Sequence, residues 1–541
     1  MHWLLMTLVV APALLSLGDQ LQDYDPAQYA EVARRMLATH EWLTLNDALG
    51  PFTNKPPMNR WAQAAAMAVL GVTSTAARLP TLLFGLLALA ATAGIGRVVW
   101  SPRTGALAAV LLGASIGFHS MVADPKVDMP VLAFSAVSVF GFVAARGRPV
   151  FVWLGWIGAG LATLSKGPVG LLLPLAAVGP ETLRAAWQPN LRWWRRPFAL
   201  RPVRGLIIVA ALTVPFYVAV ARANGADTAL YLLVGQSFGR LTGASGYRDD
   251  TTPLFFLHTG LWAFAPFTAW LIIALVRRII GLAQARTLPP EPARVAVWWL
   301  GIPFVAISLS LFKLPQYLYW LAAPAALLAA DEVSRLSDVA ASRWARAADV
   351  LGALALAGIG LALRFVFPGN WGWLAAAGAV IAVTRWLTRN ASAPERATGA
   401  WVGVTSACLV FFHGHLHGAL LAYQPWERVA GVVRAEEPQA TEIFVTGIVA
   451  PHSLAFYAQR DLRHVAPEAL AELVRERGPR LVVIGPDVSD AQLLENGLER
   501  SEERHFENYP TSVVHPAFLL HRTRADTLRT VRVAKISTTA R

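Results

Sequence analysis

Apolar windows that approach the length needed to cross a lipid bilayer recur down most of this chain. A helix needs roughly 20 apolar residues to cross about 30 Å of hydrocarbon. Only 15% of the 541 residues are charged, against about 25% in an average soluble domain. We therefore predict an all-α polytopic membrane protein with about thirteen spans. The windows lie near residues 3–17, 79–99, 104–122, 129–145, 149–164, 167–181, 203–221, 254–276, 295–312, 315–331, 347–366, 371–388 and 399–417.

The basic balance of the chain does not indicate nucleic acid. The formal net charge is +13, but the basic residues are spread over short loops rather than gathered in one domain. The single cysteine, Cys408, lies in an apolar window, so no intrachain disulfide is possible. The first window lacks the basic start of a signal peptide. We interpret it as a retained anchor, and its short length is compatible with a start further upstream.

Arginines gather in alternate loops, and this pattern predicts the orientation. By the positive-inside rule, the arginine-rich loops after the even-numbered windows are cytoplasmic. The N-terminus is then cytoplasmic, and the region after the last window lies on the outer side. The arginines concerned are Arg97, Arg103, Arg146, Arg148, Arg184, Arg192, Arg195, Arg196, Arg201, Arg204, Arg277, Arg278, Arg286, Arg294, Arg335, Arg343, Arg346, Arg385, Arg389 and Arg396.

The sequence pattern changes beyond residue 425. "TEIFVTGIV" and "PRLVVIGPD" are typical of buried strands, and "PEALAELVRERG" between them is typical of a helix that ends at Gly478. We therefore expect two domains. Residues 1–424 would form the transmembrane domain, with a first outer loop at about 18–78, and residues 425–541 a small periplasmic α/β domain.

Lysines and carboxylates gather on the predicted outer side, where orientation does not require positive charge. Snorkelling at the interface is the structural alternative for each lysine. Carboxylates can act as general bases, whereas cations can hold a phosphate. Ionisable groups at span ends are costly and tend to be functional, so the pattern indicates group transfer from a phosphorylated lipid. The residues are Lys55, Lys126, Lys166 and Lys313, with Asp19, Asp23, Asp25, Glu31, Asp124, Asp128, Asp249 and Asp250.

The stretch "DPAQYAEVARRML" allows two interpretations of Asp25. Asp25, Pro26 and Gln28 have the spacing of an N-cap, an N1 proline and a capping-box partner. The following residues predict an amphipathic helix on the outer membrane surface, with Glu31 and two arginines mostly on its polar face. Helix capping is therefore the structural alternative to a catalytic carboxylate.

The same stretch resembles the first-loop motif of the aminoarabinose transferases and protein mannosyltransferases, integral-membrane glycosyltransferases of the GT-C class. The stretches "NKPPMNRW", "VDMPVLAF", "LSKGPVGLLLP", "GQSFGRLTG" and "KLPQYLYWLAAPA" follow in the family order. The resemblance implies a GT-C fold with outer-loop amphipathic helices and a small C-terminal α/β domain. It also implies catalytic aspartates at Asp25 and Asp128. The implied substrate-binding residues are Tyr29, Lys55, Asp124, Lys166, Arg240, Lys313 and Tyr317.

Two positions depart from the family pattern. Relatives often carry Glu and Glu-His where this chain has Asn54 and Gln236-Ser237, and they can place a metal between that glutamate and histidine. The joint loss argues against a metal there. His413 and His417, one helical turn apart, are a second possible metal site, with a polar helix end as the alternative. No Walker A or Rossmann motif is present, so we expect no nucleotide and no cofactor.

The predicted reaction is the inverting transfer of a sugar from undecaprenyl phosphate to an acceptor at the periplasmic face of the bacterial inner membrane. The acceptor would be lipid A or another envelope lipid or glycan. A protein O-mannosyltransferase is one alternative. The other is a transporter or flippase without chemistry, against which stand the lack of a clear internal repeat and the one-sided charges.

Overall fold

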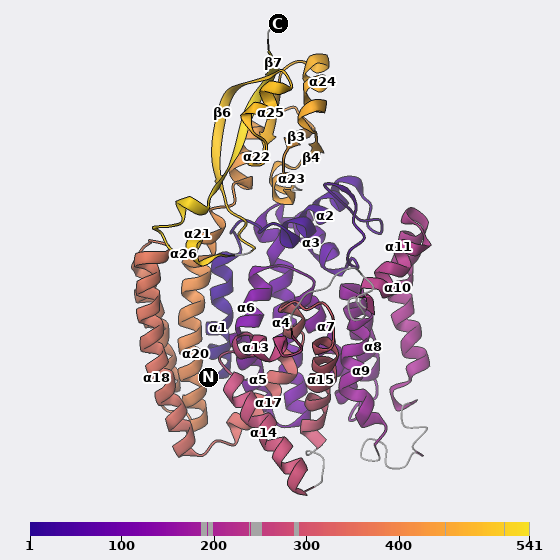
Figure 1. Ribbon diagram of the computed structural model, residues 1–541. Coiled ribbons are helices and arrows are strands. Elements are labelled where there is room, and N and C mark those ends of the chain that lie inside the picture. The colour runs from indigo at the N-terminus through magenta and orange to yellow at the C-terminus, as the bar shows by residue number, and fades with distance from the viewer. Residues whose placement is uncertain are drawn as a thin grey trace.

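The computed structural model describes residues 1–184, 192, 198–236, 238–239, 252–285, 291–448, 451–512 and 514–539. A helical bundle carries a smaller sheet-containing part at one end, and α2 and α3 lie between them (Figure 1). The elements up to residue 421 are α1 (His2–Val10), η1 (Ala11–Ser16), α2 (Asp25–Thr39), β1 (Asn46–Asp47), β2 (Gly50–Pro51), α3 (Met58–Leu70), α4 (Ser74–Val99), α5 (Pro102–Ala114), α6 (Ile116–Ala123), α7 (Asp128–Ala144), α8 (Phe151–Lys166), α9 (Val169–Thr182), α10 (Pro202–Asn224), α11 (Ala226–Leu230), η3 (Tyr231–Gly235), α13 (Phe255–Ala263), α14 (Thr268–Ala285), α15 (Glu291–Ser308), α16 (Gln316–Tyr319), α17 (Ala322–Ser334), α18 (Asp338–Leu361), η4 (Ala362–Val366), α19 (Gly372–Thr388), α20 (Ala393–Phe411), η5 (Phe412–Leu416) and α21 (His417–Leu421).

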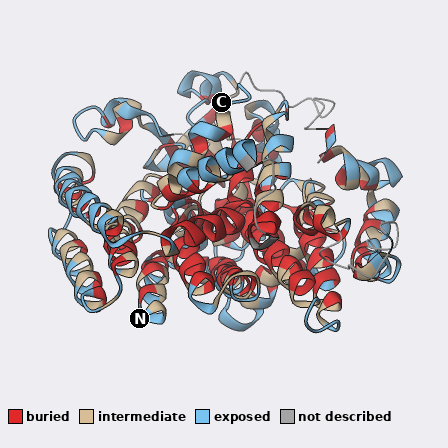
Figure 2. Ribbon diagram, turned by 90° about the horizontal axis from the view of Figure 1, so that it is seen from below, coloured by how far each residue is buried: buried red, intermediate tan, exposed pale blue. Residues whose placement is uncertain are grey.

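Four helical stretches in the described part of the chain are long and apolar enough to cross a membrane. They are Ser74–Val99, Pro202–Asn224, Asp338–Val366 and Ala393–Leu421, and the bent pair α5 and α6 would be a fifth. The remaining apolar helices are shorter, so the count of thirteen spans stays a prediction. Seen from below, buried residues fill the middle of the bundle and exposed residues follow its rim (Figure 2).

Several predicted spans are interrupted. The window at 104–122 breaks at Ser115, whose backbone is extended and whose hydroxyl accepts the Phe118 N–H at the start of α6. The window at 254–276 is two helices, α13 and α14, with Pro266 in the gap. Proline lacks the N–H that would continue a helix. Local hydrogen-bonding groups therefore break helices that the apolar pattern predicts as continuous.

Helix α2, which the sequence predicts as amphipathic, does not present a polar face to solvent. Both faces of α2 are covered, and Glu31 and Arg34 are buried. The Glu31 carboxylate accepts hydrogen bonds from Arg34 and Arg35, and Arg35 also pairs with Asp461 from the sheet-containing part. The expected solvent-exposed polar face is thus wrong, because a segment 426 residues later in the chain covers it.

The sheet-containing part packs helices on both faces of a five-stranded sheet with strand order β4-β3-β5-β7-β6. Strands β4, β3 and β5 are parallel, whereas β7 and β6 are antiparallel to their neighbours. Side chains of β3 alternate between two apolar clusters, Ile443 and Val445 in one and Phe444 in the other, as strand geometry requires. The elements are α22 (Trp426–Glu436), β3 (Glu442–Thr446), α23 (His452–Ala458), β4 (Asp461–His464), α24 (Pro467–Arg477), β5 (Arg480–Ile484), α25 (Asp490–Glu495), β6 (Leu498–Asn508), α26 (Pro516–Leu519), η6 (Ala525–Thr527) and β7 (Arg529–Thr538).

The two strands and the helix predicted here from sequence are present as β3, β5 and α24. Helix α24 ends at Gly478, whose φ is +78°. A positive φ is readily adopted by glycine, which has no Cβ.

Candidate active site

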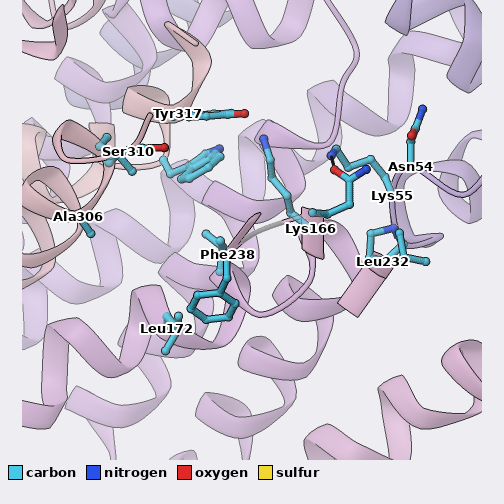
Figure 3. Close-up of a pocket in the computed structure, with 14 residues that line it drawn as sticks. Asn54, Lys55, Lys166, Leu172, Leu232, Phe238, Ala306, Ser310 and Tyr317 are labelled. Atoms are coloured by element: carbon cyan, nitrogen blue, oxygen red, sulfur yellow. Dashed lines mark hydrogen bonds between the residues drawn. The ribbon is translucent and has the colours of Figure 1, made fainter. Parts of the chain in front are cut away.

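One pocket brings together basic residues and apolar walls contributed by six segments of the bundle. Its volume is about 210 Å³. Lys55 and Lys166 lie next to each other in it, while Leu172 and Phe238 lie on another side (Figure 3). The lining residues are Asn54, Lys55, Pro56, Lys166, Val169, Leu172, Leu232, Gln236, Phe238, Ala306, Ile307, Ser310, Tyr317 and Trp320. The pocket therefore suits a ligand with an anionic group and an apolar body.

Lys166, the last residue of α8, is held by a buried carboxylate and two aromatic rings. Its ammonium lies 2.5 Å from Asp128 Oδ1, and the two side chains are only 9% and 4% exposed. The same oxygen accepts a 2.7 Å hydrogen bond from the Trp320 indole. The ammonium also lies 4.9 Å from the centre of the Tyr317 ring and 4.3 Å from that of Trp320. Asp128 is thus engaged with a cation, and Lys166 is fixed in position at the pocket wall.

Lys55 precedes two prolines, and its loop is fastened from α3. Its ammonium donates a 2.8 Å hydrogen bond to Gln236 Oε1. The buried Arg60 guanidinium donates to the carbonyl oxygens of Lys55 and Pro56. Burial lowers the pKa of Arg60 to about 10, so the guanidinium stays charged at neutral pH. Arg60 thus holds the backbone of the loop that presents Lys55.

Tyr29 from α2 packs into the same supporting layer. The Arg60 guanidinium lies 4.7 Å from the centre of the Tyr29 ring and 5.0 Å from that of Phe52. Burial and the nearby Asp25 raise the pKa of Tyr29 well above its usual value. The phenol therefore remains a hydrogen-bond donor at any physiological pH.

Asp25 belongs to a second cluster, formed by the start of α2 and the loop between α6 and α7. Lys126 Nζ lies 2.7 Å from Asp124 Oδ2 and 3.7 Å from Asp25 Oδ2. Burial raises the pKa of Asp124. Burial alone would lower the pKa of Lys126, but Asp124 and Asp25 raise it, so the ammonium is permanently charged. The Asp25 side chain is 44% exposed and can therefore meet a substrate from solvent.

The capping interpretation of Asp25 is wrong. Helix α2 begins at Asp25 itself, and no side chain caps it. The N–H groups of Ala27 and Gln28 donate to the carbonyl oxygens of Gln22 and Tyr24. The Gln28 side chain donates to Asp47 rather than completing a capping box. The carboxylate of Asp25 is therefore not needed to start the helix.

Residues of the sheet-containing part, and Gln424 in the segment that leads into it, hold the loop before Asp25. The Asp23 carboxylate accepts hydrogen bonds from the Ser453 N–H and hydroxyl. The Leu21 N–H donates 2.7 Å to the Tyr457 hydroxyl, and the Asp23 N–H donates 2.9 Å to Gln424 Oε1. Partial burial raises the pKa of Asp23 to about 7 despite the bonds from Ser453.

Not every residue expected at the site lies there. Lys313 is buried in the loop between α15 and α16 and does not line the pocket, whereas its partner Tyr317 does. Arg240, Asp249 and Asp250 lie outside the described residues. Three residues that hold the site's groups have no predicted site role. Their signal is present in the sequence, since each lies within or beside a quoted motif: Arg60, Gln236 and Trp320.

The histidines near the end of the last long helix face different partners. His413 Nδ1 lies 2.7 Å from Ser16 Oγ, and its Nε2 lies 2.9 Å from His119 Nδ1. His417 Nδ1 lies 2.5 Å from Asp19 Oδ2. These contacts fasten the N-terminal helix to the last one. No group of three or more metal-ligating side chains occurs within the ranges described above, and at the pocket the Lys55 ammonium beside Gln236 disfavours a divalent cation.

Known proteins resemble the chain in sequence. A family model described as dolichyl-phosphate-mannose-protein mannosyltransferase matches residues 54–218. The undecaprenyl phosphate-α-4-amino-4-deoxy-L-arabinose arabinosyl transferase of Pectobacterium atrosepticum is 25% identical over 80% of this chain and 77% of its own length. Transferase 2 of that name from Proteus mirabilis is 23% identical, over 57% of this chain and about half (54%) of its own length.

The solved structures extend the likeness to nearly the whole chain. The crystal structure of ArnT from Cupriavidus metallidurans bound to undecaprenyl phosphate superposes with a TM-score of 0.75 at 20% identity. The match covers 98% of this chain and 97% of that one. At this identity the likeness establishes the fold.

Proposed function

We propose that this chain, which has the GT-C fold, is an integral-membrane glycosyltransferase similar to the aminoarabinose transferases, and that it transfers a sugar from an undecaprenyl-phosphate-linked donor to an envelope acceptor. Several of the relatives are named as arabinosyl transferases for undecaprenyl phosphate-α-4-amino-4-deoxy-L-arabinose, and we take lipid A as the first acceptor to test. The reaction would occur at the periplasmic face of the inner membrane.

The observation that carries the proposal is the two-sided pocket. Lys55 and Lys166 supply two ammonium groups at one side, and apolar residues of α9, η3 and α15 supply the other. A polyprenyl phosphate has the same division, with an anionic head and a hydrocarbon tail. The phosphate would lie against the lysines and the first isoprene units along Leu172 and Leu232. Positive charge fixed beside a departing phosphate lowers the barrier of its departure.

The proposed step is a direct displacement at the anomeric carbon. An acceptor oxygen forms a bond to that carbon while the bond to the phosphate oxygen breaks. The phosphate leaves with the electron pair, and the configuration inverts. Asp25 takes the proton of a hydroxyl acceptor, or positions an acceptor that is already ionised. No cofactor enters this balance.

The other charged residues have supporting roles in this scheme. Asp128 pairs with the Lys166 ammonium and orients it, so we assign Asp128 a positioning role in place of direct proton transfer. Asp124 shares Lys126 with Asp25, so a permanently charged ammonium lies beside the carboxylate that would act as the base. Tyr29 and Tyr317 would donate hydrogen bonds or pack against the donor. Arg240 and Lys313 remain candidates for contact with the phosphate through their motif positions.

The proposed topology follows the arginine pattern. We infer about thirteen spans in residues 1–424, a cytoplasmic N-terminus, and a periplasmic α/β domain at residues 425–541. This arrangement puts the two lysines and Asp25 on the side where envelope acceptors are displayed.

A protein O-mannosyltransferase-like activity is the second candidate, favoured by the family match over residues 54–218. It would use the same pocket with a polypeptide acceptor. A transporter without chemistry explains the pocket less well, because fixed lysines at one end do not suggest alternating access.

Mass spectrometry of a deletion strain tests the proposal and separates the acceptors. Lipid A, envelope glycans and envelope proteins would be compared between wild type, deletion and complemented strains. We expect one sugar to be missing from lipid A or another envelope lipid in the deletion strain only. Loss of sugar from proteins alone would favour the second candidate. Both candidates would be contradicted if lipid A, glycans and proteins were unchanged in the deletion strain and the donor lipid did not accumulate there.

A further inference from the structure

A second polar pocket lies at the opposite end of the bundle from the sheet-containing part. It is formed where the start of α18, the end of α19 and the start of α20 meet, and its volume is about 410 Å³, within the range of small-ligand pockets. Four arginines and one aspartate line it: Arg346, Arg385, Arg389, Arg396 and Asp349.

Little of this positive charge is neutralised by the protein. Asp349 lies 3.1 Å from Arg385. Arg396 donates to the Ala391 carbonyl, and Arg389 lies over the Trp386 ring. Both of these partners are uncharged, so they do not neutralise the two guanidinium groups. The described residues offer Arg346 no ion pair. Glu395, which precedes Arg396 in the sequence, already pairs with Arg103.

Small residues create the space between the arginines. Ala341, Ala345 and Ala393 line the pocket, and α20 approaches α19 closely because Gly399 faces Thr388. The positive-inside rule requires basic residues in cytoplasmic loops, but it does not require four of them to converge on one cavity. Membrane orientation alone therefore does not explain this cluster of arginines, whereas binding of an anionic ligand does.

The surface next to the pocket is apolar and uncovered. Arg346, Val350 and Leu354 follow one another at four-residue spacing, so they lie along one face of α18. Val350 and Leu354 are each 62% exposed, and Trp386 on α19 is 59% exposed. Helix α18 lies at the edge of the bundle (Figure 1). A charged pocket that continues into an apolar helix face matches a molecule with an anionic head and acyl chains.

We propose that this pocket binds the headgroup phosphate of an anionic phospholipid in the inner leaflet, with the acyl chains along α18 and α19. Arginines suit the task because the guanidinium presents several donors to phosphate oxygens. Phospholipid bound here would hold the three helices together at the end away from the active-site pocket. The proposal does not depend on the enzymatic activity.

Lipid titration of the purified protein in a neutral detergent tests this site. Tryptophan fluorescence and thermal unfolding would be followed with phosphatidylglycerol, with phosphatidylcholine and with inorganic phosphate. For the wild type we expect saturable binding and stabilisation by phosphatidylglycerol alone. The double variant Arg346→Gln/Arg389→Gln should bind it about 30-fold more weakly, because each basic residue near an anionic lipid contributes roughly fivefold.

The matched control is Arg343→Gln/Arg434→Gln, which removes the same charge from exposed positions outside the pocket and should bind as the wild type does. Arg346→Lys/Arg389→Lys keeps the charge and should retain most of the affinity. Equal affinity in the wild type and the glutamine pair, or an equal loss in the control, would overturn the proposal. So would equal stabilisation by phosphatidylcholine, or by inorganic phosphate alone.

Discussion

Asp25 is the carboxylate on which the proposed chemistry depends, and the structure removes the competing explanation of its presence. It caps no helix, so Asp25→Asn should leave the midpoint of thermal unfolding nearly unchanged. If Asp25 removes a proton or offers its charge in the transition state, turnover should fall by on the order of 10² to 10⁴. Sugar transfer and thermal unfolding would be measured on the same preparation.

A suitable control is an aspartate in the first turn of another helix. Asp227 lies in the first turn of α11 and is exposed, so Asp227→Asn should affect neither quantity. Glu31 is unsuitable, because it is buried in ion pairs with Arg34 and Arg35 and its loss would destabilise the protein. A fully active Asp25→Asn protein would remove Asp25 as the base.

Lys55 tests the contact with the donor phosphate. Lys55→Ala should raise the donor concentration needed for half-maximal rate and lower turnover, while the protein stays folded in detergent. Lys55→Arg should restore activity only in part, because a planar guanidinium differs in geometry from an ammonium. The control is Lys535→Ala, an exposed lysine on β7. Unchanged donor dependence in Lys55→Ala would exclude the residue from the site.

Sequence patterns predicted which residues line the site better than they predicted which residues contact one another in the fold. The loop pattern predicts Lys55 and Lys166 on one side of the membrane, the family resemblance adds Tyr317, and all three line one pocket. The buried face of α2 was missed, because its partner Asp461 is far away in the sequence. The bond between Lys55 and Gln236 was missed for the same reason, since no local pattern encodes a contact between distant loops.

Helix α23 is the element that couples the sheet-containing part to the proposed catalytic loop, through the bonds of Ser453 to Asp23. Partial burial raises the pKa of Asp23 from 3.8 to about 7. The folded protein thus holds this proton more tightly than the unfolded chain does. Its contribution to stability is complete below pH 3.8 and is lost as pH rises through about 7.

Asp23→Asn should therefore flatten the pH dependence of stability between about pH 4 and pH 7. Relative to the wild type, the variant should become more stable as the pH rises, because the amide does not ionise. Thermal unfolding at several pH values would measure the difference. The control is Asp487→Asn, which changes an exposed aspartate of the sheet-containing part. Parallel curves for wild type and Asp23→Asn would contradict the raised pKa.

The order of helices was largely predictable, whereas their interruptions were not. Hydropathy identifies α4, α10, α18 and α20 because each is long and continuous. The breaks at Ser115 and Pro266 depend on a single hydroxyl and a single missing N–H, which a mean over a window of residues does not detect. Element boundaries are therefore the part that sequence determines least well.

The orientation of the whole protein in the membrane stays a prediction from arginine placement. An alkaline phosphatase fused after Arg541 should be active, because this enzyme folds only outside the cytoplasm. The same reporter fused after Arg389, in a loop predicted to be cytoplasmic, should be inactive. The reverse pattern would put Lys55, Lys166 and Asp25 on the cytoplasmic side, away from envelope acceptors.

Sugar transfer itself is most directly measured with purified protein in vesicles that contain undecaprenyl phosphate carrying radiolabelled aminoarabinose, together with lipid A. We predict that label appears on the acceptor while an equal amount of undecaprenyl phosphate is released, and that Asp25→Asn nearly abolishes both. Lipid A, envelope glycans and envelope proteins would each be supplied as acceptor. If the donor binds or crosses the bilayer but no undecaprenyl phosphate is released with any of them, a glycosyltransferase mechanism is contradicted.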